Sequence, residues 1–199
     1  MDDPFLKTLA SARPVPGGGS AAAHGALVGL TLLEKIVRVE FHRHIKDTAE
    51  RGKWEKLYQD VRALTDALRR LREEDGQAYM ELAEQRNARG NDESEKYCEA
   101  VMRAIDCPSG IMTAAAESAE LIRRTAEHCK RHLLCDLLVV CELVEAGFHG
   151  AHHIARANLP LLGNGDVGAD RATSLESAHD QGLASLRDAK EKIIAAIKR

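Results

Sequence analysis

Three consecutive glycines at the head of a long helix-forming run are the strongest single constraint on how this chain folds. Gly17, Gly18 and Gly19 follow a proline-containing turn, and Ser20 opens an alanine-rich segment. Glycine lets the backbone turn sharply and approach a neighbouring group closely, and a serine hydroxyl can accept a hydrogen bond from the first helical turn. We therefore predict a helix over residues 20–46 with Ser20 as its N-cap.

The start of this helix is also a candidate binding site. Unpaired N–H groups at a helix N-terminus carry partial positive charge and favour an anionic or carbonyl-rich ligand. A loop that does no more than cap the helix fits the same pattern. The many small residues in the first half of the helix predict close packing against another backbone, in the centre of the fold or in a subunit interface.

The rest of the sequence predicts helices as well. Ala, Leu, Glu, Lys and Arg dominate and aromatic residues make up only 4% of the chain, a composition that favours helix over strand. We expect Pro108 to interrupt the chain, residues 159–170 to form a loop, and a break at residues 88–92 to precede a helix capped by Asp92 or Ser94. Apolar residues recur with helical spacing over residues 3–11, 52–87, about 94–106, 109–128, about 131–157 and about 172–198. The prediction is an all-α bundle of about six to eight helices in one domain spanning residues 1–199.

Charge and composition exclude several classes of protein. The net charge is −3 with both signs interspersed, which argues against a nucleic-acid partner held by phosphate neutralisation. No uninterrupted apolar run approaches the roughly 20 residues of a membrane-spanning helix, and the start of the chain lacks the basic region of a signal peptide. The cysteine count is odd and no CxxC pair occurs, which indicates reduced thiols. We expect a cytoplasmic protein with no nucleic-acid or membrane partner.

Two acids, Asp75 and Asp136, stand out among apolar neighbours. A carboxylate buried near the mouth of a bundle can serve as a general acid or base. Asp75 fits an exposed position on an amphipathic helix at least as well. Asp136 is flanked by leucines and would need a polar partner if buried, for which Lys130, His132 and Asn158 are candidates.

The histidines form two groups with helical spacing. His128, His132 and Asp136 recur every four residues and would share one stripe of a helix, where they could hold zinc or iron. We prefer a polar helix face and expect no metal, because no second segment supplies ligands. His149 and His153, with His152 beside them, could line a cleft or face solvent.

The order of these motifs resembles the formiminotransferase-cyclodeaminase C-terminal domain family. Residues 12–23 are similar to its Lys/Arg-Pro-x-Pro-Gly-Gly-Gly-Ser/Ala loop and the alanine-rich helix that follows. Residues 75–79 resemble its Asp-x-x-Ala-aromatic segment, and residues 100–108 its Ala-x-x-x-Ala-x-x-x-Pro segment. Asp136 and Asn158 fall where the family has Ser-Asp and Asn-Leu.

The chain departs from the family pattern in two places. Residues 129–136 keep only the aspartate of the family segment Gly-Asn-x-Asn-x-x-Ser-Asp. Residues 41–46 are basic but differ from the family stretch Gly-Lys-Lys-Lys-Tyr.

The resemblance implies an all-helical homodimer that acts on one-carbon groups at N5 and N10 of tetrahydrofolate. A cyclohydrolase adds water to the methenyl bridge to give the 10-formyl compound, whereas a cyclodeaminase closes the formimino group and releases ammonia. Hydrolysis is slightly favoured, because a free-standing chain that hydrolyses the methenyl bridge needs no formimino-transferring partner domain. The alternative, based on the two departures, is a non-catalytic helical homologue that binds another small molecule or a protein partner.

The resemblance also implies roles for individual residues. Both reactions need proton transfer to a leaving nitrogen and stabilisation of a cationic bridge, for which Asp136 is the candidate acid–base group, with His132 and Lys130 handling charge. No cofactor beyond the tetrahydrofolate substrate is expected. The candidate substrate-binding residues are Gly17, Gly18, Gly19, Ser20, Asp75 and Asn158.

Overall fold

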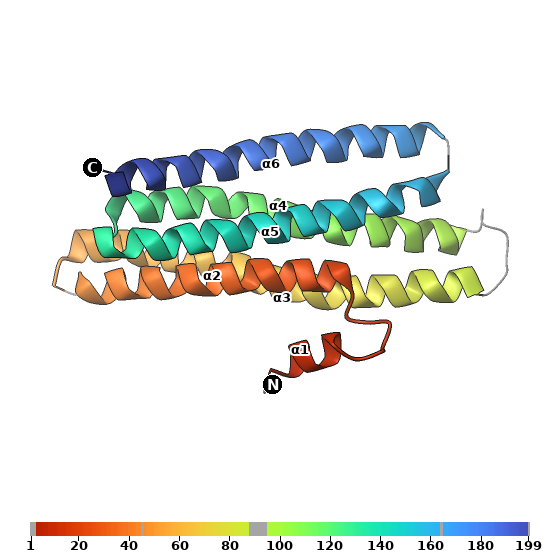
Figure 1. Cartoon of the computed structure of the whole chain (residues 1–199), viewed down its shortest axis with the longest axis horizontal. Coiled ribbons are helices and arrows are strands. Elements are labelled where there is room, and N and C mark those ends of the chain that lie inside the picture. The colour runs from red at the N-terminus through yellow and green to blue at the C-terminus, as the bar shows by residue number, and fades with distance from the viewer. Residues whose placement is uncertain (1–2, 45, 88–94, 164, 199) are drawn as a thin grey trace.

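The computed structural model describes residues 3–44, 46–87, 95–163 and 165–198. These residues form six α-helices and no strand, so the all-α prediction is confirmed. Helices α2 to α6 lie lengthwise beside one another as an elongated bundle, and the short α1 sits apart from them (Figure 1). Two 3-10 turns, at Arg131–Leu133 and Leu159–Leu162, flank α5. The helices are α1 (Pro4–Leu9), α2 (Gly18–Arg43), α3 (Thr48–Asn87), α4 (Glu95–His128), α5 (Leu134–Asn158) and α6 (Asp166–Lys198).

Close packing of α2 on α5 confirms the expectation drawn from the small residues of α2. A Cβ atom added at Gly147 of α5 would lie 2.7 Å from the carbonyl oxygen of Ala22, and one at Gly29 of α2 would lie 3.0 Å from Val144. Gly147 therefore has no room for a side chain, and a Cβ at Gly29 would require Val144 to shift. Helix α2 also contacts α3, and α4 packs on α3, α5 and α6.

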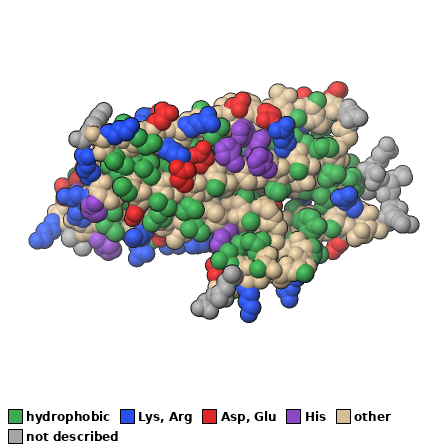
Figure 2. Space-filling model, in the orientation of Figure 1, with side chains coloured by type: hydrophobic (Ala, Val, Ile, Leu, Met, Phe, Trp, Pro, Cys, Tyr) green, Lys and Arg blue, Asp and Glu red, His purple; other side chains and the backbone are tan. Residues whose placement is uncertain are grey.

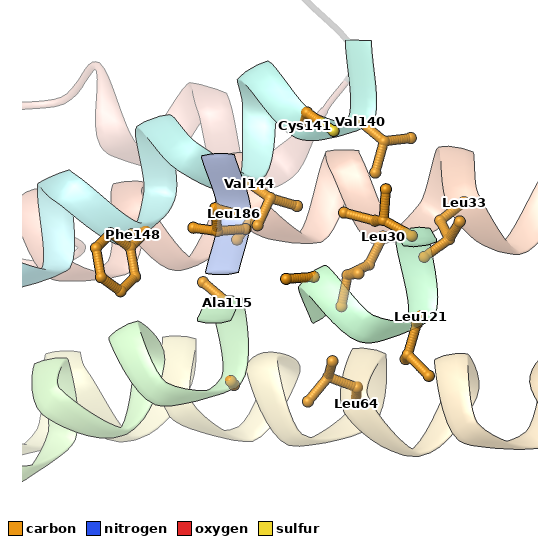
Figure 3. Close-up of a cluster of buried hydrophobic side chains, with 14 of the residues drawn as sticks. Leu30, Leu33, Leu64, Ala115, Leu121, Val140, Cys141, Val144, Phe148 and Leu186 are labelled. Carbon is orange, nitrogen blue, oxygen red and sulfur yellow. The ribbon is translucent and has the colours of Figure 1, made fainter. Parts of the chain in front are cut away.

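The main core runs through the middle of the bundle and draws on five helices. Figure 3 shows Leu30 and Leu33 of α2 beside Val140 and Val144 of α5. The same cluster includes Leu64 of α3, Ala115 and Leu121 of α4, and Leu186 of α6. Each fully buried Leu, Val or Phe side chain contributes about 1.5–3 kcal/mol relative to exposure. This burial holds the long helices in register.

Helix α2 is the one helix among the described residues that is long and apolar enough, by length and composition, to cross a membrane; the prediction drawn from apolar runs had found none. Its best 18-residue window is 56% buried inside the protein, and its apolar residues are part of the main core. The core helix of a bundle has this same character, so the packing accounts for the hydropathy of α2.

The prediction that Pro108 interrupts the chain is wrong, because α4 continues through it. Proline has no N–H and so leaves the carbonyl four residues earlier without its helical partner. That carbonyl belongs to Ala104, and the side-chain Nδ2 of Asn158 donates a hydrogen bond to it at 2.7 Å. A residue at the end of α5 thus repairs the gap in α4.

Other boundaries differ from the prediction by a few residues. Helix α6 begins at Asp166, so the predicted loop over residues 159–170 is shorter and contains a 3-10 turn. The prediction that Ser20 is the N-cap of α2 is wrong: Gly17 occupies that position and the helix begins at Gly18. The predicted break at residues 88–92 and the predicted cap at Asp92 or Ser94 lie outside the described residues. All five cysteines are unpaired thiols.

Candidate functional site

The N-terminus of α2 holds a carboxylate supplied by the chain itself. The hydroxyl of Ser20, in the first turn of α2, donates a hydrogen bond to Oδ2 of Asp75 in α3 at 2.8 Å. Asp75 is 9% exposed, so it is a buried acid rather than the exposed one that an amphipathic helix would carry. The anion-binding position predicted from the glycines is therefore occupied by Asp75.

Gly19 is required at this position for a steric reason. A Cβ atom added there would lie 2.0 Å from Oδ1 of Asp75 and 2.6 Å from its Cγ, which is far inside van der Waals contact. Glycine lets the carboxylate lie directly against the helix backbone. Gly18 faces Ile154 of α5, with 2.9 Å from its added Cβ to the Ile154 Cδ1.

The surroundings of Asp75 act on its pKa in opposite directions. Burial disfavours the charged form and raises the pKa of Asp75 above its ordinary value, whereas the hydrogen bonds from the hydroxyl and backbone N–H of Ser20 lower it. Burial has the larger effect. A carboxyl group with a raised pKa exchanges its proton closer to neutral pH, as a general acid or base must.

Asp75 opens onto a cavity of about 300 Å³ between the glycine loop, α3, α4 and the end of α5. The wall is mostly apolar, with a few polar or charged groups, which is the usual character of a small-molecule site. Its lining residues are Pro14, Gly17, Gly18, Gly19, Asp75, Tyr79, Leu82, Arg86, Ala104, Ile154, Ala157, Asn158 and Leu161.

A second, more open groove of about 660 Å³ lies on the other side of the loop, between α1 and α3. Phe5 of α1 is stacked on His24 at 4.3 Å between ring centroids, and the guanidinium of Arg72 lies 5.0 Å from the Phe5 centroid. The Arg72 guanidinium is also 3.3 Å from Nδ1 of His24, so the three side chains form one cluster. Three acids, Glu73, Glu81 and Glu84, and one cation, Arg72, line the groove. The charge of the lining is therefore negative on balance, which disfavours an anionic ligand.

The six predicted substrate-binding residues lie together at one end of the bundle. Gly17, Gly18, Gly19, Asp75 and Asn158 line the 300 Å³ cavity, and Ser20 holds the Asp75 carboxylate. Asn158 has a structural task as well, since its amide nitrogen donates to the Ala104 carbonyl.

The three predicted catalytic residues lie at the opposite end. Asp136 is half-exposed and forms an ion pair with Lys35 of α2, with 3.8 Å between Nζ and Oδ2. Lys35 lies fifteen residues beyond Ser20 along α2, which corresponds to ~22 Å of helix. Within one chain, therefore, Asp136 does not share a pocket with the glycine loop.

The partners expected for Asp136 are also different in the structure. The backbone N–H of Lys130 donates to Oε1 of Glu40 at 3.0 Å, and His132 is exposed. Asn158 lies at the other end of α5. Asp136 is exposed enough to be solvated by water and Lys35, so no buried partner is needed.

The predicted stripe of His128, His132 and Asp136 is not formed. Helix α4 ends at His128, a 3-10 turn follows at Arg131–Leu133, and α5 begins at Leu134. Spacing of four residues places side chains on one face only within a continuous helix. The second histidine group has one buried member, His152, whereas His149 is half-buried and His153 is exposed.

Three residues that are not among the predicted site residues, Tyr79, Leu82 and Arg86, line the cavity beside Asp75. These positions follow Asp75 by one, two and three helical turns, so all four residues lie on one face of α3. That spacing was visible in the sequence and, once Asp75 is placed in the site, identifies the rest of this wall.

Comparisons with known proteins agree with this architecture. The family model described as Formiminotransferase-cyclodeaminase matches residues 2–177. Among solved structures, formiminotetrahydrofolate cyclodeaminase from Thermotoga maritima is similar, with a TM-score of 0.82 and 17% sequence identity over 98% of this chain and 93% of that chain. No curated protein gives a significant match to this sequence. At this identity the structural match establishes a common fold.

Proposed function

Because this chain belongs to the formiminotransferase-cyclodeaminase family, we propose that it acts on a one-carbon group carried by tetrahydrofolate. The observation that carries the proposal is the buried Asp75 carboxylate, held by Ser20 against the Gly19 backbone at the wall of a ligand-sized cavity. A buried carboxylate facing an apolar cavity suits a substrate whose reacting carbon carries positive charge between two nitrogens.

Asp75 takes the acid–base role in this proposal. In hydrolysis, water adds to the methenyl carbon, a proton passes to N5, and the bond between that carbon and N5 breaks to leave the 10-formyl compound. In cyclodeamination, N10 attacks the formimino carbon and ammonia leaves. Both routes pass through a tetrahedral carbon and need one group that accepts and returns a proton. The raised pKa of Asp75 fits that task.

The cavity also offers binding groups for the remainder of a folate. Leu82, Ile154 and Leu161 give an apolar wall for a ring system, and the guanidinium of Arg86 is the cationic group for the glutamate carboxylate. The groove beside α1 carries three acids instead. We therefore assign the substrate to the cavity that Asp75 and Arg86 share.

Lys130, His132 and Asp136 enter this proposal only across a subunit contact. They lie too far from the cavity within one chain, so their catalytic role requires a second copy of the protein to bring them to it. The homodimer and the cytoplasmic location remain predictions from the sequence. We propose no cofactor beyond the folate, because the nucleophile is water in one reaction and N10 of the substrate in the other.

An ultraviolet absorbance assay distinguishes the two reactions, because the methenyl compound absorbs strongly in the ultraviolet. A cyclohydrolase accelerates the loss of this absorbance from 5,10-methenyltetrahydrofolate. A cyclodeaminase generates it from 5-formiminotetrahydrofolate. We favour hydrolysis. If neither substrate is converted faster than in buffer, the chain is the non-catalytic homologue. Tight binding of a folate without turnover would support that interpretation directly.

A further inference from the structure

A group of imidazole and carboxylate side chains lies between α5 and α6, separate from the glycine-loop cavity. The metal-binding atoms of His152, Glu176 and His179 all lie within 4.8 Å of one another. His152 comes from α5 and the other two residues from α6, with 4.1 Å between the His152 and His179 ring centroids. Figure 2 shows histidine side chains gathered on this face of the molecule, where Figure 1 places α5 beside α6.

The buried member of this group has a nitrogen that lacks a hydrogen bond. His152 is 4% exposed, and its Nε2 makes no hydrogen bond within the part of the chain that the structure describes. Oε1 of Glu176 lies 3.4 Å from this nitrogen, an ion-pair distance at which no hydrogen bond is formed. Buried polar atoms are nearly always paired in folded proteins, so this nitrogen is aimed at a position that another group should fill.

His179 and His149 each have one ring nitrogen that faces the other ring and one that faces away from it. The nitrogens that face away lie near carboxylates. Nδ1 of His179 lies 3.4 Å from Asp180, and Nε2 of His149 lies 3.8 Å from Glu145. The inner nitrogens, His179 Nε2 and His149 Nδ1, face each other at 3.4 Å. Carboxylates behind metal-binding histidines fix the ring tautomer and orientation in known metal sites, and Asp180 lies in that position behind His179.

The donor set suits a transition metal. Two imidazoles with one carboxylate favour zinc and its first-row neighbours, whereas calcium and magnesium prefer all-oxygen sites.

From this geometry we propose that His152, Glu176 and His179 bind one divalent transition-metal ion. The ion ties α6 to α5 and pairs the orphaned His152 nitrogen. The site contains no residue of the proposed folate cavity, so its role is structural and is independent of the proposed reaction. The sequence alone indicated no metal, because the ligands come from two separate helices.

The test is a zinc titration of the purified protein after chelation, followed by calorimetry. We expect one ion per chain and a rise in melting temperature on binding, since a ligand that binds only the folded state stabilises it. Glu176→Gln and His179→Gln should each weaken zinc binding by more than about tenfold. Both residues are partly exposed, so these variants should fold, which circular dichroism verifies. Cobalt in place of zinc should give the visible absorption of a tetrahedral site.

The matched control is His153→Gln, an exposed histidine adjacent to His152 on the same helix. It should bind zinc as the unchanged protein does. Equal affinity in the Glu176 and His179 variants would overturn the proposal. Loss of zinc binding after alkylation of the exposed thiols of Cys98 and Cys135 would also overturn it. The zinc would then be bound by cysteine thiolates and not by the histidines.

Discussion

Two buried carboxylates lie near opposite ends of α2 and differ in what surrounds them. Glu40, near the C-terminal end, is fully buried; its Oε2 contacts the Arg43 guanidinium and its Oε1 accepts the backbone N–H of Lys130. Asp75, at the N-terminal end, is held by the hydroxyl and backbone N–H of Ser20 and faces a cavity.

This difference separates a structural acid from a candidate catalytic one. Glu40 has a cationic partner, Arg43, on its own helix, and the Lys130 N–H that it accepts joins α2 to the turn between α4 and α5. Asp75 has neutral donors and a raised pKa, so its proton remains exchangeable. Burial alone therefore does not identify a catalytic acid. What distinguishes Asp75 from Glu40 is that its hydrogen-bond donors are neutral.

Replacing Asp75 with Asn tests the functional side of the comparison and has the largest expected effect. The amide keeps the size of the side chain but cannot accept and return a proton, so turnover of the folate substrate should fall roughly 10²- to 10⁴-fold. Steady-state absorbance assays measure this. Turnover within a few fold of the unchanged protein would remove Asp75 from the mechanism.

Replacing Glu40 with Gln tests the structural side. Loss of the charge weakens the contacts to Arg43 and to the Lys130 N–H, and hydrogen bonds to charged groups contribute about 1.5–3 kcal/mol each. We expect the unfolding free energy, measured by urea denaturation, to fall by at least about 1.5–3 kcal/mol. If Asp75→Asn destabilises the protein as much as Glu40→Gln does, the distinction between the two acids fails.

Replacing Gly19 with Ala tests how tightly the functional acid is seated. The new Cβ would lie 2.0 Å from Oδ1 of Asp75, so the carboxylate or the helix must move, at a cost of about 1–3 kcal/mol. The matched control is Gly17→Ala, whose Cβ would come no closer than 4.0 Å to the Pro14 carbonyl oxygen. Urea midpoints should separate the two variants; similar midpoints would mean that the carboxylate is loosely held.

The pH dependence of stability provides a smaller effect of known sign. Below the unfolded-state pKa of an Asp, about 3.9, both states hold the proton. Burial raises the pKa of Asp75 in the folded state, so on raising the pH the unfolded state loses its proton first and stability falls. The unfolding free energy of the protein minus that of Asp75→Asn should therefore decline from acid to neutral pH. A difference that rises with pH would show that the Ser20 donors outweigh burial.

The sequence predicted the helices well because their apolar periodicity is local. It failed where a distant residue decides the outcome. Pro108 remains inside α4 because Asn158 donates to the carbonyl that the proline leaves unpaired. Ser20 is not a cap because its hydroxyl is directed to Asp75, on another helix. Neither partner is near in the chain, so no local pattern could reveal them.

The candidate site was predicted in part for the same reason. The glycines, Ser20, Asp75 and Asn158 were identified and lie together. Asp136 is predicted to share the pocket because it falls where the family has Ser-Asp, and the resemblance makes it the acid–base group. Helix α5 instead starts, after the turn that follows α4, beside the end of α2 that is far from the glycine loop. Asp136 is exposed there and pairs with Lys35 at the surface.

Replacing Asp136 with Asn has the smallest expected effect on the fold and decides what this second acid does. Its ion pair with Lys35 is long, and the two side chains are 43% and 64% exposed, so the loss of stability should stay below about 1 kcal/mol. If Asp136 acts across a subunit contact, turnover falls nonetheless. Mixing this variant with Asp75→Asn then restores part of the activity. Half of the randomly formed dimers contain one chain of each variant, and each of these has one intact site. About a quarter of all sites are therefore intact. Full turnover by Asp136→Asn alone would exclude the residue from catalysis and leave the glycine-loop end of α2 as the complete site.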